Sequence, residues 1–160
     1  MRILSKSVIF AIAAAALPLA TPVSAQLVTP KDPQAISSAI KEKGWPAKLV
    51  LPDDDNPYIE SNYNEMKFIV LFMNCDDEHQ NCTTLQYYMG FSDAKNTTLE
   101  QLNEWNKTKR FGRAYRDDAD DPVLEMDVDL DFGGIPRANL LETLNIWSSL
   151  MDAYQAHLFG

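Results

Sequence analysis

The chain has 160 residues, of which 23 are acidic and 14 are basic, so its formal net charge is −9. A surface this acidic repels nucleic acid and anionic lipid, and we expect neither as a partner. The length fits one domain built around a single core.

Residues 1–25 have the pattern of a secretory signal peptide. Two basic residues precede an apolar stretch from Val8 to Ala20, and the small-residue sequence VSA provides a cleavage site after Ala25. A spanning helix would need roughly 20 apolar residues, and a proline interrupts this run. We therefore expect export, cleavage, and a single domain over residues 26–160 without stable membrane insertion. Cleavage removes two positive charges, so the formal net charge changes from −9 to −11.

The first element predicted in the mature chain is a helix. Asp32 is placed as its N-cap, Pro33 occupies its first position and Gly44 ends it. Residues 47–52 then have the composition of a strand, and residues 57–63 form a short extended piece after an acidic turn.

Two further strands form a predicted central hairpin. Residues 65–73, EMKFIVLFM, are apolar on both faces apart from Lys67, which predicts a central strand covered on at least one side and in part on both. Residues 83–91 supply its partner.

The loop of this hairpin holds both cysteines, Cys75 and Cys82. In an oxidising compartment two such cysteines are more often bridged than free, and opposed positions of a hairpin lie within disulfide reach. A zinc site would need two more ligands, and the chain has only two histidines. A reactive pair is the remaining alternative, although the spacing is not that of a C-x-x-C redox site.

A second helix is predicted from Thr97, because Thr97 and Glu100 have capping-box spacing. The basic residues Lys107, Lys109 and Arg110 end it. A second hairpin follows over residues 111–131. A long C-terminal helix then begins after Pro136, with apolar residues recurring every three or four positions. The fold class expected is α+β, with an antiparallel sheet of about five strands packed against helices.

The last strand of the second hairpin alternates apolar and acidic residues. Glu125, Asp127, Asp129 and Asp131 share one face, and the last three are candidate ligands of a hard cation such as calcium. The simpler interpretation is a solvated face whose like charges discourage association between sheet edges. Carboxylates on a flat strand point outward in parallel, so we expect no metal and no cofactor.

The chain lacks the sequence patterns of zinc proteases, phosphate-binding loops, nucleophile elbows and dinucleotide-binding folds. A bridged cysteine pair supplies no nucleophile. We therefore expect a protein that is not an enzyme.

Several segments resemble one known family. They are KEKGW (41–45), PYIES (57–61), TLEQLNEWNKTKRFGRAYRDD (98–118) and PVLEMDVDLDFGG (122–134). Together they are similar to the YbjN-domain family of bacterial sensory transduction regulators, over about residues 33–158. The resemblance implies a fold like that of type III secretion chaperones, with element order α-β-β-β-α-β-β-α, and a bacterial protein that binds a protein or peptide partner. Many relatives are cytoplasmic, whereas the signal peptide of this chain indicates a periplasmic or secreted protein. Because related secretion chaperones dimerise, the resemblance is also compatible with a homodimer.

The most specific part of the resemblance supplies the candidate site residues: Asn103, Trp105, Asn106, Arg110, Arg113 and Tyr115. In a structural interpretation Trp105 anchors the helix to the sheet, and the flanking amides satisfy backbone groups. In a functional interpretation these amides and Arg113 grip the backbone of a bound peptide. The leading hypothesis for the whole chain is an exported, non-catalytic binding module; the alternative is a cation-binding module that uses the acidic loops.

Overall fold

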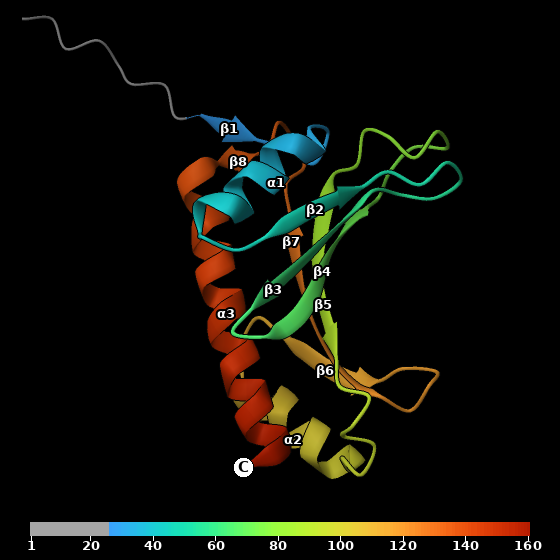
Figure 1. The fold of residues 1–160 in the computed structure, drawn as a ribbon, viewed down its shortest axis with the longest axis vertical. Helices are drawn as coiled ribbons and strands as arrows, with labels where there is room; N and C mark the ends of the chain where they lie inside the picture. The colour runs from blue at the N-terminus through green and yellow to red at the C-terminus, as the bar shows by residue number, and fades with distance from the viewer. Residues whose placement is uncertain (1–25) are drawn as a thin grey trace, which may run out of the picture.

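The computed structural model describes residues 26–160 (Figure 1). The expected signal peptide, residues 1–25, lies outside the described residues. In chain order the elements are β1 (Leu27–Val28), α1 (Pro33–Glu42), β2 (Ala47–Val50), β3 (Tyr58–Tyr63), β4 (Met66–Met73), β5 (Thr84–Gly90), α2 (Leu99–Thr108), β6 (Arg113–Arg116), β7 (Pro122–Asp129), β8 (Ile135–Pro136) and α3 (Arg137–Phe159).

Six strands form one antiparallel sheet in the order β2-β3-β4-β5-β7-β6, and β1 pairs with β8 in a separate two-stranded sheet. The predicted α+β class with an antiparallel sheet is confirmed. The main sheet has one strand more than the five expected, because residues Tyr58–Tyr63 pair along their whole length with β4 and also with β2.

All three helices lie on one side of the six-stranded sheet, as Figure 1 shows. The buried core fills the space between these layers. Trp147 of α3 is fully buried there, with its ring 6.2 Å from Phe68 of β4 and 5.7 Å from Tyr87 of β5. Trp105 of α2 packs against Tyr154 of α3 at 4.8 Å, which ties the second helix into the same layer.

Helix α1 begins as the sequence predicts. The side chain of Asp32 accepts a hydrogen bond from the backbone N–H of Ala35, and Pro33 occupies the first helical position. Gly44 follows the helix with a φ of +79°, a left-handed conformation that favours glycine.

Helix α2 begins one residue later than predicted. Its N-cap is Thr98, which accepts from the N–H of Gln101, while the Gln101 side chain accepts from the N–H of Thr98. Thr97 and Glu100 do not form the expected capping box, because the Thr97 hydroxyl is buried and donates to the carbonyl of Ala94.

The N-terminal strand β1 is packed against the domain. Val28 is 2% exposed, and the carbonyl of Gln26 accepts a hydrogen bond from Arg137 at the start of α3. Gly134, with a φ of +91°, lies so close to β1 that a Cβ atom there would be 2.1 Å from the carbonyl oxygen of Val28. Gly134 therefore allows the chain to pass close to β1, because any other residue would place a Cβ atom against Val28.

Candidate partner-binding face

The side of the six-stranded sheet that faces away from the helices forms what we call the open face. Along β4 the residues Met66, Phe68, Val70 and Phe72 are buried under the helices, whereas Ile69, Leu71 and Met73 alternate with them and are partly exposed. Alternate residues of a strand point to opposite faces of its sheet. The apolarity of β4 on both sides was therefore a real signal, but among the described residues the helices cover one side only.

The strand register extends this apolar surface across the sheet. Leu71 pairs with Tyr58 on one side, and Ile69 pairs with Tyr88 on the other. The partly exposed residues at the centre of the open face, which we call the apolar patch, are Val50, Tyr58, Ile69, Leu71, Met73 and Tyr88. A contiguous apolar surface on a folded protein is typical of a site that binds another protein.

One end of the open face carries a network of charged and phenolic groups around Glu125. Glu125 is 4% exposed; it accepts hydrogen bonds from Arg113 Nε at 2.8 Å and from the Tyr115 hydroxyl at 2.5 Å. Arg113 also pairs with Asp127 at 3.0 Å. Burial, then the bond to Glu125, raises the pKa of Tyr115, and the bond to Glu125 raises the pKa of Arg113. The network holds Tyr115 neutral and Arg113 charged.

This network corrects one part of the expectation that four acids of the last strand share a solvated face, because Glu125 is buried. Strand β7 lies inside the sheet, between β5 and β6, so it is not an edge. The pairing with β6 sets Arg113 opposite Glu125 and buries that carboxylate. It also leaves Arg113 engaged within the protein, which disfavours the idea that this side chain grips a bound peptide.

The three candidate cation ligands do not converge. Asp127 accepts from Gln86 and Arg113, the carboxylate of Asp129 accepts from the N–H of Asp131, and Asp131 accepts from the N–H of Phe132. Within residues 26–160 no group of three or more His, Cys, Asp or Glu side chains is placed to hold a metal ion.

Trp105 and Asn106 of α2 form hydrogen bonds with the backbone of the neighbouring β6 segment. Asn106 accepts from the N–H of Ala114 at 2.8 Å and donates to its carbonyl at 2.9 Å. The Trp105 indole N–H donates to the carbonyl of Gly112. The two Asn106 bonds occupy backbone groups of β6, an outer strand of the sheet, and the Trp105 bond lies just before it. An occupied edge is protected from pairing with other chains. The geometry favours the structural interpretation of this pair.

The remaining two motif residues point elsewhere. Asn103 is exposed on α2, and Arg110 lies in the loop after that helix with its guanidinium 4.8 Å from the centre of the Phe111 ring. Phe111 is itself 61% exposed. The six candidate residues therefore do not form one site. Arg113 and Tyr115 lie on the open face, Trp105 and Asn106 lie where α2 meets β6, and Asn103 and Arg110 are exposed.

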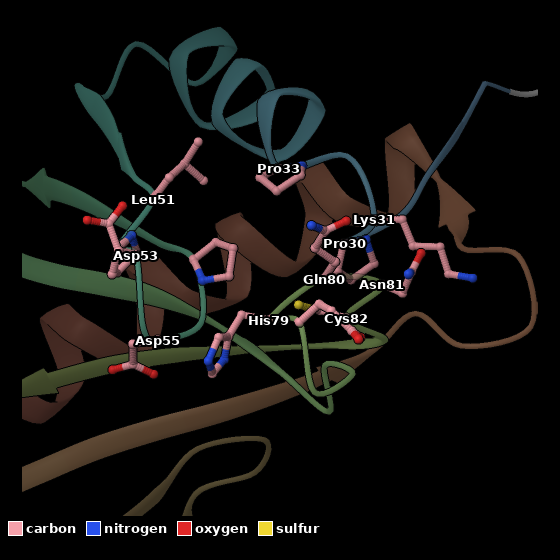
Figure 2. Close-up of a pocket in the computed structure, with 13 residues that line it drawn as sticks. Pro30, Lys31, Pro33, Leu51, Asp53, Asp55, His79, Gln80, Asn81 and Cys82 are labelled. Atoms are coloured by element: carbon pink, nitrogen blue, oxygen red, sulfur yellow. The ribbon is translucent and has the colours of Figure 1, made fainter.

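The cysteines are joined by the expected disulfide, Cys75–Cys82, in the loop between β4 and β5. This loop borders a pocket of about 550 Å³, lined also by the approach to α1 and the β2–β3 loop (Figure 2). His79 lies at the pocket with its Nδ1 atom 2.9 Å from the side-chain oxygen of Asn56. Sequence reasoning missed this pocket, because its walls come from three segments that are distant in the chain.

The helices of residues 26–160 do not include one with both the length and the apolar composition that crossing a bilayer requires. The family comparison bears on the whole domain. A family model described as "Putative bacterial sensory transduction regulator" matches residues 32–160. Searches of curated proteins and of solved structures gave no match. Since the matched region covers nearly the whole described domain, the chain belongs to the YbjN family.

Proposed function

We propose that this protein is an exported, non-catalytic binding module that regulates a process of the bacterial cell envelope by holding a protein partner on its open face. The observation that carries the proposal is the apolar patch on a sheet whose opposite face is already packed against three helices. Covering apolar side chains on the exposed face of a sheet with another surface removes them from water and lowers the free energy. The family description as a regulator is in keeping with a role in binding.

Support for a non-catalytic role comes from the groups that chemistry would need. The buried carboxylate of Glu125 is bonded to Arg113 and Tyr115. The imidazole of His79 contacts the Asn56 side chain, and that of His157 contacts the carbonyl of Gln101. These bonds fix the side chains in the structure of the domain, whereas a general acid or base must be placed to reach a substrate.

Support for export comes from two separate features. Residues 1–25 have the tripartite composition of a signal peptide, and the Cys75–Cys82 bridge is of a kind that persists in oxidising compartments. Whether the mature protein stays in the periplasm or leaves the cell is decided by fractionating cells that express the full chain and locating the processed form.

Capture in the native envelope tests the binding role. A tagged full-length chain is cross-linked in the intact cell envelope, and captured proteins are quantified by mass spectrometry. The variant Leu71→Thr removes the central leucine of the apolar patch but keeps a residue suited to a strand. The matched control, Leu99→Thr, changes an equally apolar side chain that is 72% exposed on α2.

We expect L71T to reduce capture and L99T to leave it unchanged, with both variants keeping the melting temperature of the original chain within a few degrees. A single recurrent partner would assign a regulator or adaptor, and many exported clients would assign a chaperone. Equal capture by L71T and the original chain would refute binding through the open face.

A further inference from the structure

Three acidic loops border the open face. The β2–β3 loop and the disulfide loop lie at one end of the sheet, and the β6–β7 turn lies at the other (Figure 1). In Figure 1 all three extend away from the side that the helices occupy. Their acidic residues are Asp53, Asp54, Asp55, Asp76, Asp77, Glu78, Asp117, Asp118, Asp120 and Asp121.

These ten carboxylates are largely uncompensated. Asp120 pairs with Arg116 and Asp121 pairs with Lys95; the other eight form no ion pair within the part of the chain that the structure describes. The three loops contain no lysine or arginine. At physiological salt a charge acts over roughly 8 Å, so neighbouring carboxylates in each loop add to one local negative potential.

The centre of the surface between the loops is apolar, with the exposed Lys48–Glu60 ion pair in the same row of the sheet as Ile69. The apolar patch occupies β2, β3, β4 and β5 at the centre of the face. Strand β7, whose eight residues run from the β6–β7 turn to the end of the sheet that bears the disulfide loop, spans about 27 Å at roughly 3.4 Å a residue. An α-helix of about 18 residues has the same length, at 1.5 Å a residue. A helix that lies along the open face would therefore reach from the acidic loops at one end to those at the other.

A second copy of this chain is a poor occupant of the face. It would bring its own acidic loops against the acidic loops of the first copy, and juxtaposed like charges oppose association. A partner with basic residues around an apolar stripe meets both features at once, because its apolar side chains cover the patch and its lysines or arginines meet the loops.

We propose that the open face binds a basic amphipathic helix of a partner protein, with the apolar stripe of the helix on the patch and its cationic residues toward the three acidic loops. This inference rests on the proposed function and adds the chemistry of the partner. It implies attraction that salt weakens and an apolar contact that salt does not weaken.

Three synthetic helical peptides of about 18 residues, a length set by the 1.5 Å rise of a helix, serve as probes. The first has a leucine stripe with lysines on its polar face, the second replaces every lysine by glutamate, and the third keeps the lysines but replaces every leucine by serine. Binding of each fluorescently labelled peptide to the processed, oxidised protein is measured by anisotropy at low and at physiological salt.

The leucine–lysine peptide is expected to bind, and the other two are expected to bind at least about tenfold more weakly, a difference of roughly 1.4 kcal/mol. L71T should weaken the leucine–lysine peptide about tenfold, as truncation of a central apolar contact commonly does, and L99T should not. The triple variant D53N/D54N/D55N should reduce the salt dependence of binding. The control E100Q/E104Q/E142Q, which removes three exposed charges from α2 and α3, should change it less.

Each contrary outcome has a distinct meaning. If the glutamate peptide binds as well as the lysine peptide, or if no leucine peptide binds, the basic-helix inference is wrong, while loss of envelope capture in L71T would still uphold the proposed function. If sedimentation reveals a dimer that L71T dissociates, the occupant is a second copy and the inference fails. If the leucine–lysine peptide binds L71T unchanged, the open face is not its site.

Discussion

Glu125 carries a carboxylate that is almost wholly removed from solvent, and its hydrogen bonds determine what Arg113 and Tyr115 can do. Both donors approach the same carboxylate from the edge strand β6. Leaving either donor without this acceptor would cost more than an ordinary surface contact, because charged hydrogen bonds contribute about 1.5–3 kcal/mol. The network therefore stabilises the join between β6 and β7.

The first prediction compares Glu125 with its neighbour on the same face. Glu125→Ala should lower the free energy of unfolding by about 2 kcal/mol, because it removes the shared acceptor. Asp127→Ala should lower it by less than about 1 kcal/mol, because that carboxylate is 47% exposed and its ion pair is screened by water. Urea unfolding followed by circular dichroism measures both. Equal losses in the two variants would show that burial of Glu125 does not set its contribution.

Asn106 provides a second contrast within one motif. Its amide satisfies both backbone groups of Ala114 on the outer strand, whereas Asn103 is exposed on the same helix. Asn106→Ala should lower the free energy of unfolding by about 1–2 kcal/mol and should increase self-association through the freed edge of β6. Asn103→Ala should do neither. Unfolding and light scattering at matched concentrations would reveal whether the two asparagines differ.

Ionisation of Tyr154 is expected to lower the free energy of unfolding at alkaline pH. It is fully buried and donates to the carbonyl of Val123, and burial raises the pKa of its hydroxyl above the value of about 10 expected in the unfolded chain. The unfolded chain therefore loses this proton first. The stabilisation by neutral Tyr154 is complete below about pH 10 and is lost as the pH rises from there toward the pKa of the folded state.

The variant Tyr154→Phe has no hydroxyl to ionise, so it isolates this effect. The original chain should be more stable than the variant between pH 7 and pH 9, and the difference should narrow above about pH 10. Urea unfolding at a series of pH values measures the difference. A gap that stays constant up to pH 11 would mean that ionisation of Tyr154 is not linked to unfolding.

At the scale of elements, the disulfide loop joins the two strands that carry most of the apolar patch. The Cys75–Cys82 bridge closes this loop between β4 and β5. Loop-entropy arguments give about 2.5 kcal/mol for a closed loop of this length. The double variant Cys75→Ala/Cys82→Ala should lose about that amount in urea unfolding, and adding reductant should not destabilise the variant further. A double variant as stable as the oxidised parent would show that the bridge does not stabilise the domain.

The elements that could be predicted were those specified by local chemistry. Asp32 and Pro33 marked the start of α1 because capping depends on adjacent residues. The start of α2 was less certain locally, because Thr97 and Thr98 each have a partner of capping type three residues later. Thr98 is the N-cap because the hydroxyl of Thr97 donates to the carbonyl of Ala94 in the preceding turn.

The candidate site could be predicted only in part, because the residue pattern of a single strand does not determine which strands lie beside it in the sheet. The alternation of β7 indicated which residues share a face, but not that β6 returns beside it with Arg113 opposite Glu125. The apolarity of β4 indicated cover on at least one side and in part on both, and the helices of the described domain cover one side. The open face thus follows from the arrangement of layers, whereas the disulfide followed from spacing and compartment.

At the scale of the molecule, the distribution of charge and the layer arrangement support one account. The helices cover one side of the sheet, the other side bears the apolar patch, and acidic loops stand at both ends of that side. In the proposed function this face recognises the partner, with apolar area for affinity and charge for selectivity.

Site-specific photo-cross-linking in the native cell envelope tests the central claim most directly. A photo-reactive amino acid is placed at position 71 on the open face and, in a parallel strain, at position 99 on α2. The account predicts that position 71 cross-links to a partner protein whose linked segment is basic and amphipathic, and that position 99 does not. Cross-links of equal yield from both positions, or from position 99 alone, would contradict the claim that the open face is the binding surface.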